Sequence, residues 1–158
     1  MKNKTTLNII FYISIFALGS AYFIEYILDY KPCNLCLIER LPYFFAIIII
    51  LLGLSLNRFE KFIFISLGLI FASATILSLY HVGIEQGFFK ESLVCVSNNE
   101  MNILNKKDLL NEFQKTTVSC KDVEFTLFGL SLATINVIIS LILSVITFKL
   151  FLNYEKNR

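Results

Sequence analysis

The sequence predicts an all-α membrane protein, a bundle of four transmembrane helices in a single domain that covers residues 1–158. Two observations support this prediction. Of the 158 residues, 56% are hydrophobic and only 16% are charged, which is too apolar for a soluble domain of this length. Four apolar stretches are also long enough, or nearly so, to cross about 30 Å of hydrocarbon as helices. They run over residues 7–28, 41–56, 62–82 and 127–148.

The first apolar stretch has a cleavable signal peptide as its alternative, because Lys2 and Lys4 precede it and small residues lie within it. The apolar region of a signal peptide is about 7–15 residues long. This stretch runs from Leu7 to Leu28 and is longer. We therefore expect a membrane span.

The second stretch is slightly shorter than the usual span of about 17–25 residues. We expect it to extend back toward Leu37, with Glu39 and Arg40 at the membrane interface.

Lysine and arginine predict the orientation of the bundle. Basic residues outnumber acidic ones on the side that carries both termini and the 57–61 turn, whereas acidic residues are in excess on the other side. The positive-inside rule then predicts that both termini are cytoplasmic and that the loops 29–40 and 83–124 are periplasmic. All four cysteines would face the oxidising side of a bacterial inner (cytoplasmic) membrane, where disulfides persist.

The long second periplasmic loop contains a candidate amphipathic helix over residues 101–116. Leu109, Leu110 and Phe113 are spaced for one helical face, and charged residues are available for the other. A short helix on the membrane surface would bury that face. A helix packed on top of the bundle is the alternative.

The four cysteines are the chemically informative residues. Cys33 and Cys36 form a Cys-x2-Cys motif, whereas Cys95 and Cys120 lie apart in the second loop. A zinc site of four thiolates would favour a second Cys-x2-Cys, and haem attachment would need His where Leu37 stands, so neither is expected. Two structural disulfides are the serious alternative, because a Cys95–Cys120 bond would stabilise the fold by about 3–4 kcal/mol. A Cys33–Cys36 bond closes almost no loop, and such a tight pair is typical of redox chemistry.

Arg40 is a candidate partner of the Cys-x2-Cys motif. It follows Cys36 by one helical turn, so the two share a face if this segment is helical. A nearby cation and a helix N-terminus both favour a thiolate at Cys36. The alternative is an interface anchor that pairs with Glu39 or a lipid phosphate.

The run Lys31–Arg40, with the sequence KPCNLCLIER, resembles the first periplasmic loop of the DsbB family, quinone-dependent disulfide generators of the bacterial inner membrane. The similarity continues through Tyr80-His81, residues 118–123, residues 127–133 and Asn136. It covers nearly the whole chain, including the four-span layout.

The resemblance implies a catalytic role for all four cysteines. A reduced DsbA-like periplasmic protein of the thioredoxin fold would attack a Cys95–Cys120 disulfide at Cys95. The released Cys120 would open a Cys33–Cys36 disulfide, and the Cys36 thiolate would pass electrons to a membrane quinone.

The resemblance also implies a binding site for ubiquinone, or for menaquinone when oxygen is scarce. Arg40 would lie against the quinone together with Cys36, and His81 would lie near it. A single His at a helix end is otherwise more often a capping or interface residue. Family members often carry Trp where Ile135 stands. This chain therefore lacks an interface anchor at that position, but it loses no redox group.

Three alternatives remain open. One is a quinone reductase of the vitamin K epoxide reductase type, although its redox motif would be expected near the fourth span, which has no cysteine. The others are a small accessory membrane protein with purely structural disulfides, and a relative devoted to one periplasmic client. No metal is expected to be required. The sequence has no nucleotide-binding glycine motif and no dense basic patch, which argues against a nucleotide cofactor and nucleic acid.

Overall fold

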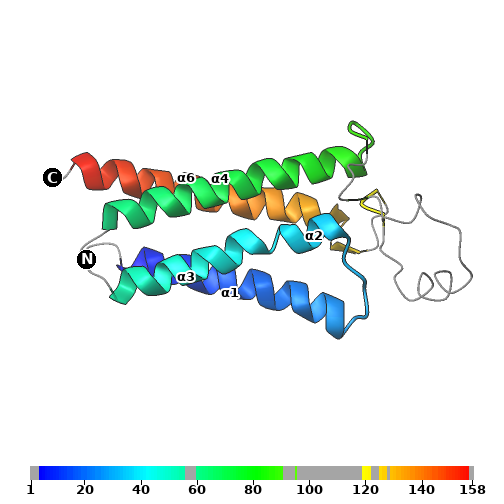
Figure 1. Cartoon of the computed structure of the whole chain (residues 1–158), viewed down its shortest axis with the longest axis horizontal. Helices are drawn as coiled ribbons and strands as arrows, with labels where there is room; N and C mark the ends of the chain where they lie inside the picture. The colour runs from blue at the N-terminus through cyan, green and yellow to red at the C-terminus, as the bar shows by residue number, and fades with distance from the viewer. Residues whose placement is uncertain are drawn as a thin grey trace, which may run out of the picture.

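The computed structural model is a bundle of long helices (Figure 1). It describes residues 4–55, 60–90, 95, 119–121, 125–127 and 129–156. Within this part, four helical segments are long and apolar enough to cross a membrane, which confirms the predicted helical membrane protein. Those segments are Lys4–Tyr26, Asn34–Leu54, Lys61–Glu85 and Leu132–Asn153. The elements are α1 (Lys4–Tyr26), α2 (Asn34–Ile38), α3 (Leu41–Ser55), α4 (Glu60–Glu85), β1 (Thr126–Leu127), β2 (Leu130–Ser131) and α6 (Leu132–Lys156).

The second span consists of α2 and α3, with a break between them. Arg40 N–H bonds the carbonyl of Leu37, a tighter turn than that of an α-helix. Pro42 follows directly and has no N–H to continue the helical ladder. The predicted extension of this span toward Leu37 is confirmed. Because of the break, α2 and α3 are two separate helices (Figure 1).

The fourth span begins at Leu132, so the predicted start at residue 127 is wrong. Residues Thr126–Leu127 and Leu130–Ser131 instead pair as a two-stranded antiparallel hairpin. Gly129 has a φ of +80° in its turn, a conformation that glycine adopts without strain. Ser131 then caps α6, because its Oγ accepts the backbone N–H of Thr134 at 3.2 Å.

Small and hydroxylated residues bring α4 and α6 together. Gly68 lies against the ring of Phe148, and the Thr75 hydroxyl donates to Ser140 Oγ at 3.1 Å. Close approach at small residues and hydrogen bonds between helices are typical of packing in membranes. Outward-facing apolar side chains such as Phe16 are largely exposed, as expected for a surface that faces lipid.

The candidate site lies at one end of the bundle. α1 begins and α6 ends at the same end, whereas α2 and the hairpin lie at the other (Figure 1). The prediction that the end with both termini is cytoplasmic rests on charge and stays a prediction. The candidate amphipathic helix at 101–116 lies outside the described residues.

Candidate redox site

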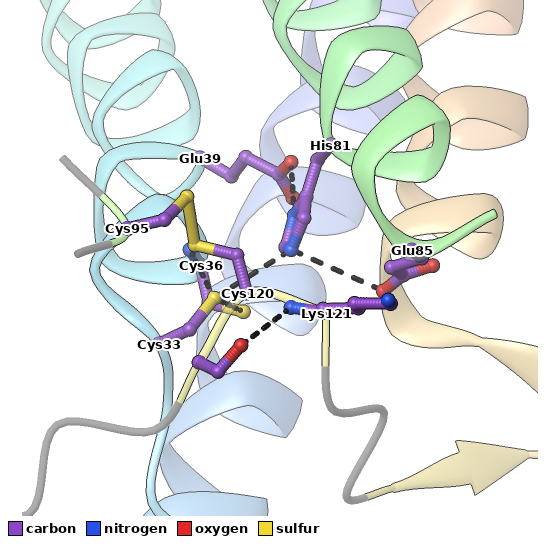
Figure 2. The surroundings of a disulfide bond; sticks show 9 residues. Cys33, Cys36, Glu39, His81, Glu85, Cys95, Cys120 and Lys121 are labelled. Atoms are coloured by element: carbon purple, nitrogen blue, oxygen red, sulfur yellow. Dashed lines mark hydrogen bonds and ion pairs between the residues drawn. A yellow bond between two sulfur atoms is a disulfide. The ribbon is translucent and has the colours of Figure 1, made fainter. Parts of the chain in front are cut away.

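All four cysteines meet at the end of the bundle that carries α2. Cys33, Cys95 and Cys120 belong to one buried cluster with Leu35 and Ile84, and Cys36 packs against it. Cys95 and Cys120 form a disulfide, whereas Cys33 and Cys36 are thiols. Figure 2 shows this disulfide beside the Cys33–Cys36 pair. The structure therefore joins two cysteine pairs that lie far apart in the sequence.

Cys33 is the N-cap of α2, and several groups stabilise its sulfur. Its Sγ accepts the backbone N–H of Cys36 at 3.2 Å and lies 2.7 Å from Cys36 Sγ. His81 Nε2 lies 3.5 Å away. Hydrogen bonding by the Cys36 thiol, followed by that of His81, holds the pKa of the Cys33 thiol well below its ordinary value, although burial opposes the shift.

These contacts favour a thiolate at Cys33, whereas the sequence suggested one at Cys36. The sequence prediction relied partly on Arg40, which was expected to stabilise Cys36. The Arg40 guanidinium forms an ion pair with Glu25 of α1 and lies 5.0 Å from the centre of the Tyr22 ring. Its partner is thus a residue of the first span and not Glu39. The N-terminus of α2 also favours a thiolate, but at its N-cap residue Cys33 and not at Cys36.

His81 connects the cysteine pair to two carboxylates. It lies on α4, and only 2% of its surface is exposed. Its Nδ1 bonds Glu39 Oε1 at 2.9 Å, and its Nε2 lies 3.9 Å from Glu85 Oε1 (Figure 2). Because a carboxylate only accepts, Nδ1 carries the proton of that bond. Nε2 is then the nitrogen directed at Cys33.

Glu39 links His81 to a buried polar network that centres on Asn136. Only 7% of the surface of Glu39 is exposed, and its predicted position at the membrane interface stays a prediction. Asn136 of α6 donates its amide to Glu39 Oε2 at 2.9 Å and to Ser78 Oγ at 2.7 Å. The Tyr43 hydroxyl donates to Asn136 Oδ1. Among the described residues, every buried polar side-chain atom has a hydrogen-bond partner.

A cavity of about 190 Å³ opens beside these groups. Both pairs reach it, because Cys33, Cys36 and Cys120 all line it. The other polar groups around it include Glu39, Arg40, Tyr43, His81, Glu85 and Asn136, and its apolar wall includes Ala17, Leu18, Ala21, Ile24, Leu132, Ala133, Ile135 and Ile139. The volume is below the roughly 300–1,000 Å³ of a pocket for a whole drug-sized ligand. It suits a ring-sized group with polar substituents.

The site brings together Cys33, Cys36, Cys120, Arg40 and His81, all of which the sequence analysis had singled out. Sequence reasoning missed the roles of Glu39, Tyr43, Ser78 and Asn136 in the network. Glu39 and Asn136 carried a usable signal, since polar residues placed inside or beside membrane spans are costly unless they have partners.

Two comparisons with known proteins found matches over most of this chain. The family model described as "Disulfide bond formation protein DsbB" matches residues 3–150, which include the four cysteines and the four spans up to Leu150. An uncharacterized protein of Rickettsia prowazekii (strain Madrid E) is 33% identical over 149 residues. That alignment covers 92% of this chain and 85% of the Rickettsia protein.

Proposed function

The chain belongs to the DsbB family of thiol oxidoreductases of disulfide bond formation, and we propose that it carries electrons from a DsbA-like periplasmic dithiol protein to a membrane quinone. The observation that supports this most strongly is the meeting of two cysteine pairs at one cavity. Cys120, which is bonded to Cys95, lines the same cavity as Cys33 and Cys36. Thiol–disulfide exchange requires this proximity, because one sulfur must attack the other directly.

The first half of the proposed reaction moves two electrons from the partner to the Cys33–Cys36 pair. A thiolate of the partner attacks Cys95 Sγ, the Cys95–Cys120 bond breaks, and Cys120 leaves as a thiolate. Cys120 then attacks Cys33 of a Cys33–Cys36 disulfide, which releases Cys36. The second thiol of the partner frees Cys95, which displaces Cys33 from Cys120. The loop disulfide is thereby restored and the Cys33–Cys36 dithiol remains, which is the arrangement of the structure.

The second half reoxidises Cys33 and Cys36 to a disulfide, with loss of two electrons and two protons. A quinone, when bound, accepts both. Its ring fits the chemistry of the cavity, because the apolar wall suits a flat ring and the polar groups around it include the guanidinium of Arg40. Ubiquinone and menaquinone both have a flat ring that accepts two electrons and two protons.

The residues of the site divide this work. Cys33, with its lowered pKa, is the nucleophile that closes the bond, and Cys36 is the sulfur attacked as the electrons leave. His81 Nε2 is placed to hold the proton that Cys33 releases. Glu39 fixes the ring of His81 through Nδ1 and is itself held by Asn136.

The direct test is quinone reduction by the purified protein supplied with a reduced DsbA-like partner. We expect the absorbance of the oxidised quinone to fall by one equivalent for each partner dithiol oxidised. A Cys36→Ser variant, which cannot close the inner disulfide, should abolish this signal. A partner that stays reduced in the presence of both protein and quinone would contradict the proposal.

We further propose that the chain is one integral domain with its cysteines on the periplasmic side of the inner membrane. The bias of Lys and Arg toward the end with both termini supports this orientation. A membrane-impermeant thiol reagent should therefore label the cysteines of intact cells after reduction. Labelling that requires disruption of the inner membrane would reverse the topology.

A second candidate function has one observation in its favour. Cys95 and Cys120 are only 3% and 2% exposed, as in a disulfide that merely braces a loop. An accessory membrane protein with structural disulfides would show the same burial. Such a protein would form no mixed disulfide with a dithiol partner, so trapping separates the two functions.

A further inference from the structure

Three metal-ligating atoms lie together at the candidate site. Cys33 Sγ, Cys36 Sγ and His81 Nε2 are all within 4.8 Å of one another. Two come from the start of α2 and the third from α4, so the set is absent from any single stretch of the sequence. Two thiolates and an imidazole are ligands that Zn²⁺ prefers.

The spacing of these atoms can be compared with that of a tetrahedral site. Zn–S bonds of about 2.3 Å and Zn–N bonds of about 2.0–2.1 Å place S and N about 3.5–3.6 Å apart and two S atoms about 3.8 Å apart. Cys33 Sγ and His81 Nε2 already have the first separation, at 3.5 Å. The two sulfurs are 2.7 Å apart and must separate by about 1 Å. Cys36 is half-buried beside the cavity, which gives its side chain room to rotate.

Glu39 orients His81 as a metal ligand. Metal-bound histidines almost always donate their second ring N–H to a carboxylate, a carbonyl or a water, which fixes the ring and increases its basicity. Nδ1 of His81 bonds Glu39 Oε1 at 2.9 Å, and this leaves Nε2 facing the sulfurs. Glu85 lies 3.9 Å from Nε2 and adds a second carboxylate. The fourth position falls to this carboxylate or to water.

We propose that Cys33, Cys36 and His81 of the reduced protein form a binding site for a soft divalent cation of the Zn²⁺ class, which inhibits the enzyme. Binding displaces the thiol protons and changes no oxidation state. The bound cation occupies both sulfurs, so neither can attack or leave. The inhibition rests on the proposed function, whereas the binding requires only the dithiol.

The binding test uses the full chain in which Cys95→Ser and Cys120→Ser remove the loop thiols as competing ligands. Zn²⁺ affinity of the reduced protein is measured by competition with a chromogenic chelator. We expect one equivalent to bind, and His81→Gln or Glu39→Gln to weaken binding about 10–100-fold. The matched control is Glu25→Gln, because Glu25 pairs with Arg40 and not with the three ligands, and its affinity should be unchanged.

Co²⁺ gives a second readout, because its absorption reports coordination by thiolates directly. Its thiolate-to-metal absorption should appear with the reduced protein, disappear in Cys33→Ser, and be absent after Cys33 and Cys36 are oxidised to a disulfide. Mg²⁺ should not compete, since it prefers oxygen ligands. Binding that is unchanged by His81→Gln, or no stoichiometric binding, would overturn the inference.

Quinone reduction separates this inference from the proposed function. With both correct, Zn²⁺ at saturating concentration abolishes quinone reduction, and a chelator restores it. If protein purified without metal reduces quinone equally well with and without added Zn²⁺, the inhibitory site is contradicted and the proposed function is not. A protein that binds Zn²⁺ stoichiometrically but never reduces quinone would support the binding site and contradict the proposed function.

Discussion

The lowered pKa of Cys33 predicts an unusual pH dependence for its reactivity. Hydrogen bonding by Cys36, and then by His81, lowers the pKa of the Cys33 thiol to about 4. Its thiolate therefore persists as the pH falls and is lost only as the pH approaches that value. An ordinary thiol, with a pKa of about 8.5, is mostly protonated at pH 6 and gains about 75-fold in thiolate by pH 8. Cys33 should gain almost nothing over the same interval.

The shape of the profile is a better measure than the absolute rate. A thiolate of lower pKa is also a weaker nucleophile, with a Brønsted slope of about 0.4–0.5. A shift of this size raises the thiolate population at pH 6 about 300-fold but lowers intrinsic reactivity about 100-fold, so the net gain is only about threefold. A flat profile remains diagnostic.

The assay is alkylation of the reduced protein by iodoacetamide between pH 6 and pH 8, with a chelator present and each site quantified by tandem mass spectrometry. Cys36→Ala removes the main hydrogen-bond donor and should make the Cys33 profile rise steeply with pH. The matched variant Cys36→Ser keeps a hydroxyl donor and should preserve most of the flatness. His81→Gln should have an intermediate effect, because its contribution is smaller. A steep Cys33 profile in the protein with both thiols would refute the reasoning.

Three further predictions concern the loop pair, Arg40 and Asn136. Cys120→Ser should accumulate a mixed disulfide between Cys95 and a DsbA-like partner on non-reducing gels, and Cys95→Ser should not; if neither traps the partner, the structural-brace function is favoured. Apparent quinone affinity, measured by steady-state kinetics, should weaken from Arg40 through Arg40→Lys to Arg40→Ala, because Lys lacks the planar fork of donors, while disulfide exchange continues. Unchanged quinone dependence in Arg40→Ala would return Arg40 to the role of membrane anchor. Asn136→Leu leaves Glu39 Oε2 without its donor and should cost about 1–3 kcal/mol of stability, measured as a lower Tm in detergent; an unchanged Tm would show that this bond contributes little.

The spans were predictable because hydrophobicity over the length of a membrane is a property of contiguous sequence. The start of the fourth span was not. Leu127 and Leu130 are as apolar as the helix that follows, and only Gly129 and Ser131 mark the hairpin that separates them from it. Local turn chemistry outweighed hydropathy there.

The cysteines of the site were predictable from their motif, but their environment was not. Glu39 bonds His81, which lies 42 residues away in the sequence, and Asn136, which lies 97 residues away. Spacing along one helix gives no information about such partners. The same limit explains Arg40, whose position one turn after Cys36 suggested a contact that its ion pair with Glu25 replaces.

The burial of the loop disulfide separates the two halves of the proposed reaction. Cys95 and Cys120 must lie close to Cys33 for exchange between the pairs, and in that arrangement they are only 3% and 2% exposed. A thiolate of a soluble partner has no access to Cys95 there. Attack by the partner therefore requires an arrangement in which the disulfide has left the buried cluster.

This requirement has a kinetic consequence. If the open arrangement is a minor population, the apparent affinity for the partner is reduced by that fraction. Substitutions that weaken the packing of the disulfide on Leu35 and Ile84 should then speed exchange with the partner and slow transfer to Cys33. The proximity that makes internal electron transfer efficient is thus the same feature that limits access of the partner.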